Sequence, residues 1–174
     1  MITLINGRGQ LGNSLQRFVE NEMSTSENFF IYHTWNILDK SEELQKKCFD
    51  NFREFVDQNL NERIFFISTY SQTDNPYNHY KHLAEEYLRK NNPNGKSIRL
   101  PTLIGKGTCE GFLRGSNTPY GQMELLSVDD AATKIMEIIH SSEPYGLFRV
   151  YGDVISARLV NSLIIFGRDA KHEN

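Results

Sequence analysis

The chain has 174 residues, 39% of them hydrophobic and 24% charged, which is enough to bury the core of one globular domain and too apolar for a disordered protein. Its net charge of −3 and pI of about 6.0 give no basis for binding nucleic acid or an anionic membrane. The two cysteines lack metal-ligand spacing, and no apolar run reaches the roughly 20 residues that cross a bilayer. We therefore expect a cytoplasmic protein without a metal, nucleic-acid or membrane partner.

Apolar runs and helical spacings alternate along the first half of the chain. Each short apolar run predicts a buried strand, and each amphipathic stretch predicts a helix beside it. The expected elements are a strand at 2–6, a helix through Leu11–Val19, a strand at 29–32, a helix from Ser41 to about Leu60, a strand at 64–67, and a helix that begins at Asn75-Pro76 and ends before Asn92.

The second half continues this alternation with one long interruption. Glycine and polar residues from 105 to 121 predict a loop. The other expected elements are a strand at 97–100, an extended piece at 125–126, a helix started by Asp129 or Asp130, a strand at 147–150, and a last helix capped by Ser156. Strands that alternate with helices indicate one Rossmann-like α/β domain over 1–174, with a doubly wound parallel sheet flanked by helices. Residues 102–174 are expected to add a small substrate-side lobe.

A glycine motif follows the first predicted strand and opens the first predicted helix. Residues 7–12 read G-R-G-Q-L-G and match G-x-G-x-x-G. Small residues there allow a tight turn, a close approach to a pyrophosphate, and packing of the helix against the sheet. Backbone N–H groups at the helix start then face the anion. The motif predicts a dinucleotide site, although a plain tight turn without a ligand has the same pattern.

The acidic residue that usually follows such a motif by about 20 positions is not evident. The second predicted strand ends at Tyr32-His33-Thr34, without a carboxylate. A carboxylate there would favour NAD and repel a 2′-phosphate. Its absence, together with Arg8 in the loop, gives a weak preference for NADP over NAD.

Tyr77 and Lys81 form a Y-x-x-x-K pair at the start of a predicted helix. The spacing places both side chains on one face of the helix, and an ammonium one turn away is expected to lower the pKa of the phenol. Such a pair can pass a proton to or from a sugar oxygen while hydride moves to or from a nicotinamide. Ser68 and Thr69 end the preceding strand, where a parallel sheet presents its ligand edge. Strand-end capping and an ordinary surface Tyr and Lys remain the alternative interpretation.

Four stretches in this order resemble the extended short-chain dehydrogenase/reductases of the NAD-dependent epimerase/dehydratase family. They are INGRGQLGNSL, RIFFISTYSQTDNPYNHYKHLAEEYL, SIRLPTLIGKG, and LLSVDDAATKIMEII followed by YGLFRVYGDVISARLVNSLI. The nearest likeness is to dTDP-4-dehydrorhamnose reductases and sugar-nucleotide epimerases. Tyr70-Ser71 stands where the dehydratase branch usually carries an acidic pair, which argues against dehydration.

The resemblance implies an NAD(P)-dependent oxidoreductase or epimerase that acts on a nucleotide-activated sugar, in surface polysaccharide biosynthesis, as a homodimer. It implies that Tyr77 is the acid/base, Lys81 its electrostatic partner and ribose anchor, and Thr69 the hydroxyl that orients the substrate. The expected cofactor-binding residues are Gly7, Arg8, Gly9, Gln10, Leu11, Gly12, Ser68, Lys81 and Pro101. Lys106 and Arg114, in the predicted loop, are candidates for binding the substrate diphosphate.

The chain also departs from that family. Members are longer and normally place a further strand between the positions of Ile31 and Ile64, where we find only helical or polar sequence. Thr69 and Tyr77 are close in sequence, so the usual substrate loop between them is shortened. A second hypothesis is therefore a catalytically inactive Rossmann module that serves in binding or oligomerisation.

Overall fold

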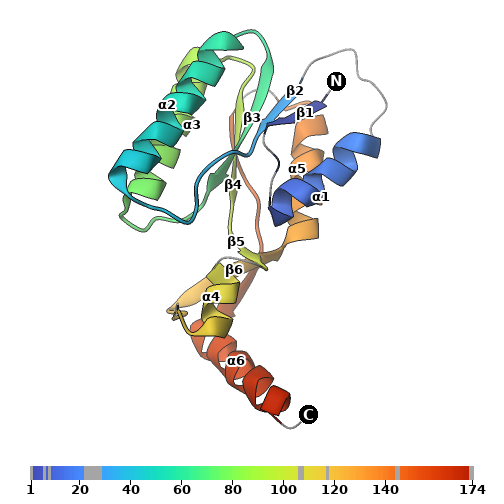
Figure 1. The fold of residues 1–174 in the computed structure, drawn as a ribbon. Coiled ribbons are helices and arrows are strands. Elements are labelled where there is room, and N and C mark those ends of the chain that lie inside the picture. Colours follow the sequence, from blue (N-terminus) through green and yellow to red (C-terminus); the bar gives the residue numbers. More distant parts are fainter. Residues whose placement is uncertain are drawn as a thin grey trace.

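The computed structural model describes residues 2–5, 7, 9–21, 29–105, 108–116, 118–143 and 146–172. Its centre is a parallel five-stranded sheet in the order β1-β2-β3-β4-β7 (Figure 1). The strands are β1 (Ile2–Ile5), β2 (Phe29–Tyr32), β3 (Arg63–Thr69), β4 (Lys96–Leu100) and β7 (Gly146–Arg149).

Helices cover both faces of this sheet (Figure 1). The helices α1 (Gln10–Asn21) and α5 (Val128–His140) pack together on one face, and α2 (Glu42–Gln58) and α3 (Pro76–Asn91) pack on the other. The alternation along β3 serves both cores, since Phe65 and Ile67 face α1 and α5 while Ile64 and Phe66 face α2 and α3. The predicted parallel α/β sheet with helices on both faces is confirmed.

The strand order runs in one direction without reversing. The steps from β1 to β2, β2 to β3 and β3 to β4 all go to the adjacent strand on the same side. The helix α1 nevertheless lies on the face opposite α2 and α3. Two crossovers that step the same way over opposite faces have opposite hands. The sheet therefore contains at least one left-handed crossover, which is rare in parallel sheets. In addition, β1 pairs with β2 alone among the described strands and forms an edge.

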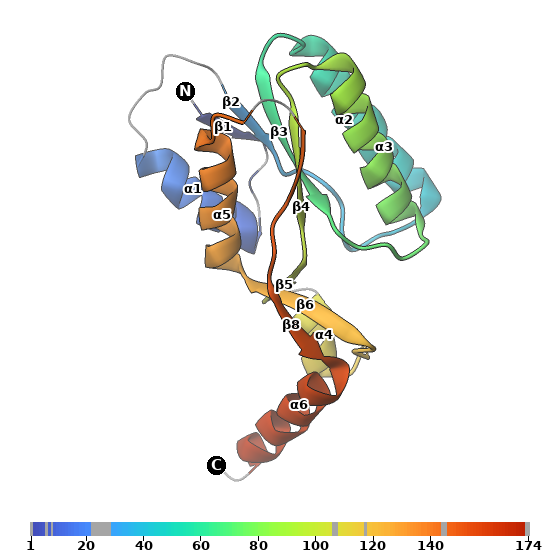
Figure 2. The same cartoon turned by 180° about the vertical axis from the view of Figure 1, so that it is seen from behind.

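A second, three-stranded sheet lies beyond the carboxyl end of β4 (Figure 2). It contains β5 (Thr102–Ile104), β6 (Gln122–Ser127) and β8 (Asp153–Ser156), and it is accompanied by α4 (Thr108–Arg114) and α6 (Ala157–His172). The expectation of a loop throughout 105–121 is wrong, because α4 occupies part of it and buries Phe112 against Leu125 and Val160. None of the described helices combines the length and the apolarity needed to span a bilayer.

The predicted helix starts are confirmed in part. Asn75 caps α3, because its Oδ1 accepts a hydrogen bond from the Asn78 N–H at 3.0 Å. Ser156 Oγ accepts from Leu159 N–H at 3.3 Å at the start of α6. For α5 the expected cap is wrong: Ser127 takes that position and accepts from Asp130 N–H at 3.0 Å. Asp129 and Asp130 instead lie in the first turn, where carboxylates favour the helix dipole.

Candidate nucleotide and proton-transfer site

The glycine motif forms a tight turn between β1 and α1. A Cβ added at Gly12 would collide with the backbone of Gly7, so the helix approaches the turn more closely than any side chain allows. Gly9 adopts a φ of +92°, which favours glycine, and its carbonyl accepts from Asn13 N–H at 2.9 Å. This geometry suits an anion at the amino end of α1. Arg8 lies outside the described residues.

The other predicted residues of the motif and the strand end have distinct positions. Leu11 is buried in the core between α1 and the sheet. The side chain of Gln10 lies against Gly105, at the end of β5, since a Cβ on that glycine would meet it. Pro101 is half-buried between β4 and β5. The structure therefore brings the glycine turn and the β5 end together.

Lys81 lies buried at the carboxyl end of β3, with 5% of its surface exposed. Its Nζ donates to the Ile67 carbonyl at 2.6 Å and lies 5.0 Å from the ring centre of Phe66 and 5.2 Å from that of Trp35. Burial lowers the pKa of this ammonium to about 7, against an opposing effect of the Glu85 charge. Lys81 is thus poised to titrate near neutrality.

Tyr77 lies beside Lys81, with its ring centre 5.6 Å from the Lys81 Nζ and 5.5 Å from the Lys40 Nζ. Burial raises the pKa of the Tyr77 phenol to about 12. The expectation that the ammonium lowers this pKa is therefore wrong for this structure, because burial disfavours the charged phenolate. The phenol is protonated at neutral pH and can give up a proton rather than take one.

The hydroxyls at the end of β3 differ in their partners. Thr69 Oγ1 accepts from Ser71 N–H at 3.1 Å, within the turn that follows the strand. Ser68 Oγ is buried and has no hydrogen-bond partner in the described part of the chain. A buried hydroxyl without a partner is costly, so Ser68 is a fitting position for a polar ligand atom.

Two residues that follow β2 belong to this region and were not among the predicted site residues. Burial, together with the Lys81 charge, lowers the pKa of His33 to about 4, so His33 is neutral. Trp35 donates from Nε1 to Gln45 Oε1 at 2.7 Å and packs on Phe66. Only their place after a strand could have drawn attention to them.

Of the two predicted substrate-side residues, the structure describes Arg114, which does not join Tyr77 and Lys81. Arg114 is on α4 of the second sheet, with its side chain 74% exposed and paired with Glu110 at 2.5 Å. Lys106 lies outside the described residues. Their role in binding a diphosphate stays a prediction.

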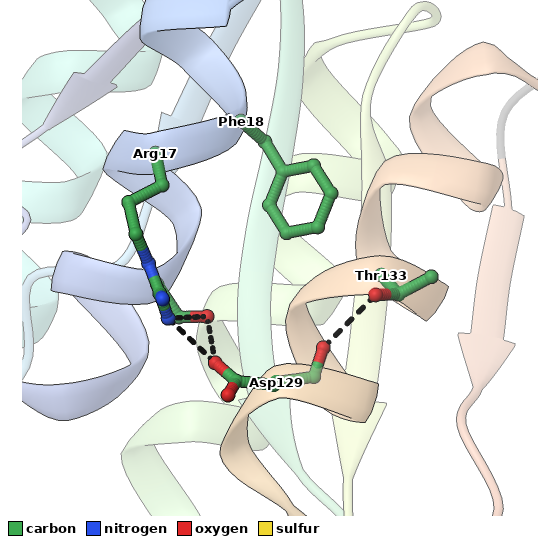
Figure 3. Close-up of a pocket in the computed structure, with 5 residues that line it drawn as sticks. Arg17, Phe18, Asp129 and Thr133 are labelled. Atoms are coloured by element: carbon green, nitrogen blue, oxygen red, sulfur yellow. Dashed lines mark hydrogen bonds and ion pairs between the residues drawn. The ribbon is translucent and has the colours of Figure 1, made fainter.

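Two shallow hollows lie on the described part of the molecule. One of about 230 Å³ separates α1 from α5, where Asp129 Oδ1 accepts from Arg17 at 2.6 Å and from Ser14 at 2.7 Å (Figure 3). The other lies beside Asp39 and Lys47 at the start of α2. Among the described residues, no group of three or more His, Cys, Asp or Glu side chains is placed to hold a metal ion.

No model of a known protein family and no curated protein matches the sequence, but solved structures match the fold. A dTDP-4-dehydrorhamnose reductase from Clostridium acetobutylicum matches with a TM-score of 0.72 and 15% identity over 94% of this chain and 78% of that one. The Bacillus anthracis dTDP-4-dehydrorhamnose reductase, in complex with NADP, gives 0.69 and 15% over 93% and 80%. The Bacillus cereus UDP-N-acetylglucosamine 4-epimerase gives 0.64 and 17% over 94% and 80%.

The fold and these likenesses place the chain among the Rossmann-like α/β proteins. Within that class it has the fold found in solved sugar-nucleotide epimerases and reductases, as the sequence resemblance predicted.

The strand order revises one sequence argument. Because β2 pairs with both β1 and β3, it occupies the place of the fourth strand in the doubly wound order 3-2-1-4-5-6. The ribose carboxylate belongs at the end of the second strand, on the other side of β1. The missing carboxylate after Tyr32 therefore gives no information about NADP or NAD. The segment absent from this chain precedes Phe29 and does not lie between Ile31 and Ile64.

Proposed function

We propose that the protein is an NAD(P)-dependent reductase or epimerase of a nucleotide-activated sugar. The observation that carries the proposal is the buried Lys81 ammonium, held by the Ile67 carbonyl at the end of β3 and 5.6 Å from the Tyr77 ring centre. A buried lysine with a pKa near 7, beside a phenol at the ligand edge of a parallel sheet, is an arrangement for proton transfer. The resemblance further suggests a cytoplasmic homodimer that serves surface polysaccharide synthesis.

The residues present fit a nicotinamide nucleotide at two points. The glycine turn accepts a phosphate at the start of α1, and the Ser68 hydroxyl lacks a partner. Lys81 Nζ has three donors, and the structure shows one hydrogen bond from it, to Ile67. Lys81 would therefore hold a ribose hydroxyl with another. A bound, reduced nicotinamide would supply hydride to a substrate carbonyl carbon.

The protonated Tyr77 supports the direction of carbonyl reduction. With a pKa of about 12, the phenol carries its proton at neutral pH and would pass it to the carbonyl oxygen that becomes the alcohol. The Lys81 ammonium would stabilise the phenolate that forms, and Thr69 would orient the same oxygen. Solvent protons then restore the phenol.

The alternative, an inactive module for binding or oligomerisation, has an observation of its own. Trp35, Phe66 and Tyr77 surround the Lys81 ammonium and leave it 5% exposed. A lysine enclosed in this way can be a structural residue of the core, with no ligand to meet.

A direct test is NADH and NADPH oxidation with a panel of dTDP-, UDP- and GDP-linked 4-ketosugars. We expect turnover with at least one pair, and a loss of kcat of about 10²- to 10⁴-fold in Tyr77→Phe with little change in KM. Tyr120→Phe is the matched control, because that phenol is 76% exposed on the second sheet's side.

One result would decide for the inactive module. It is the absence of turnover with every pair, combined with no change in protein fluorescence at millimolar NADH or NADPH. Equal activity in Tyr77→Phe and Tyr120→Phe would instead show that Tyr77 does not donate the proton.

A further inference from the structure

The glycine turn of this chain stands at an edge of the sheet. In the doubly wound fold the dinucleotide lies across the point where the strand order reverses, with strands on both sides of β1. Here β2, β3, β4 and β7 all lie on one side of β1, and no described strand lies on the other. The described residues therefore include no strand on the side of β1 that would contact the adenosine.

The connection after α1 is too short to contain the missing half of the fold. Residues 22–28 are all that separate Asn21, the end of α1, from Phe29, the start of β2. A βαβ unit takes about 30 residues, and the missing half of the fold needs two strands and their helices. Residues 22–28 are too few to hold those two strands with their helices.

On the other side of the glycine turn, the strands β2, β3 and β4 are all present. The carboxyl ends of β2, β3 and β4 place His33, Ser68 and Pro101 along one edge, and Lys81 reaches that edge through its bond to Ile67. The features that fit a nicotinamide ribose are therefore present, while those that fit an adenosine ribose are absent from the described residues.

We propose, building on the function proposed above, that this site recognises the nicotinamide mononucleotide half of the cofactor and gives the adenosine half almost no binding energy. The ligand that this site recognises is therefore a nicotinamide ribose 5′-phosphate. Two consequences follow. The reduced mononucleotide NMNH binds nearly as tightly as NADH, and NADPH binds nearly as tightly as NADH, because no described strand lies on the side of β1 where the 2′ position would be recognised.

The test is titration of the full chain with NMNH, NADH and NADPH by calorimetry, with 5′-AMP as a competitor. We expect the three dissociation constants to agree within tenfold, and 5′-AMP at 10 mM to leave them unchanged. A dissociation constant for NADH or NADPH more than tenfold below that of NMNH overturns the inference and leaves the proposed function standing. Competition by 5′-AMP would likewise overturn the inference and leave the proposed function standing.

The remaining outcome separates the two proposals. If none of the three binds at millimolar concentration, both the inference and the proposed function fail.

The variant Gly12→Ala tests whether the ligands bind at the glycine turn, since the added Cβ would meet the Gly7 backbone. It should weaken all three ligands by the same factor. Gly121→Ala, at an open position with a φ of +62°, is the control for a glycine substitution elsewhere. Unequal weakening of the three ligands by Gly12→Ala would show that the adenosine half is read near that turn.

Discussion

The two faces of the central sheet are filled by different kinds of side chain. The face under α2 and α3 is aromatic, with Tyr32, Phe52 and Phe66 in contact at ring distances of 4.5–6.3 Å. The face under α1 and α5 is largely aliphatic, with leucine, isoleucine and alanine side chains in the core. The aromatic face holds Tyr77 and Lys81, and the aliphatic face carries the helix that the glycine turn begins.

This difference separates two ways of building a site. Large rings fix Lys81 by enclosure, so its position and its lowered pKa both depend on packing. The glycine turn depends on the absence of side chains, which lets α1 approach the end of β1. Substitutions should therefore affect the two parts through different physical causes.

The largest expected effect is on the stability of the aromatic face. Phe52→Ala removes a fully buried ring that contacts Tyr32 and Phe66, and we expect it to lower the free energy of unfolding by about 3–5 kcal/mol. Leu15→Ala, also fully buried but on the aliphatic face, should cost less, about 2–4 kcal/mol. Urea denaturation of both variants measures the difference, and equal costs would remove the distinction between the faces.

The next effect is a rise of stability with pH above neutrality. The pKa of Lys81 falls from 10.5 in the unfolded chain to about 7 in the folded one, so between these values the unfolded state binds more protons. Stability should therefore increase from pH 7 to pH 9, by up to about 1.4 kcal/mol per pH unit. Lys81→Met should flatten this slope. A wild-type profile that is flat or falling in this range would show that Lys81 is charged and solvated.

A smaller effect of the same sign is expected in acid. The pKa of His33 is lowered from 6.5 to about 4, mainly by burial, so the unfolded chain binds the extra proton between these values. Stability should fall as the pH drops from 6.5 towards 4. His33→Gln should lose part of this dependence, whereas the exposed His140→Gln should keep it. Identical acid unfolding midpoints for the two variants would contradict the assignment.

The smallest effect concerns the ion pair across α1 and α5. Arg17 and Asp129 lie 2.6 Å apart, but their side chains are 67% and 74% exposed, so solvent and salt screen their attraction. We expect Arg17→Ala to leave the melting temperature nearly unchanged at 0.15 M salt. A large loss would mean that this pair, rather than the cores, couples the two helices.

Periodicity and turn chemistry predicted most of the main sheet. The strands at 29–32 and 64–67 and the cap at Asn75 follow from local patterns that the tertiary structure supports. The short strands β5 and β8 and the helix α4 could not be found in this way. Each has three to seven residues and depends on contacts with distant segments, such as Phe112 with Leu125 and Val160.

The candidate site also depends on contacts with distant segments, which local sequence patterns do not predict. The spacing of Tyr77 and Lys81 indicates the pair, but the raised pKa of the phenol depends on burial in the folded chain. The approach of Lys40 to the Tyr77 ring is likewise a contact that no local pattern reveals. The neighbourhood of β2 was also beyond sequence reasoning, because strand order is a property of the whole sheet. That order alone determines which side of β1 the strand at 29–32 occupies.

The single tryptophan of the chain gives this protein an internal optical probe. The Trp35 indole lies 5.2 Å from the Lys81 Nζ and is held by Gln45. A ligand that draws the ammonium towards a ribose, or a pH change that discharges it, alters the electric field at the indole. Indole emission, excited selectively over that of the eight tyrosines, would therefore follow events at the lysine without a label.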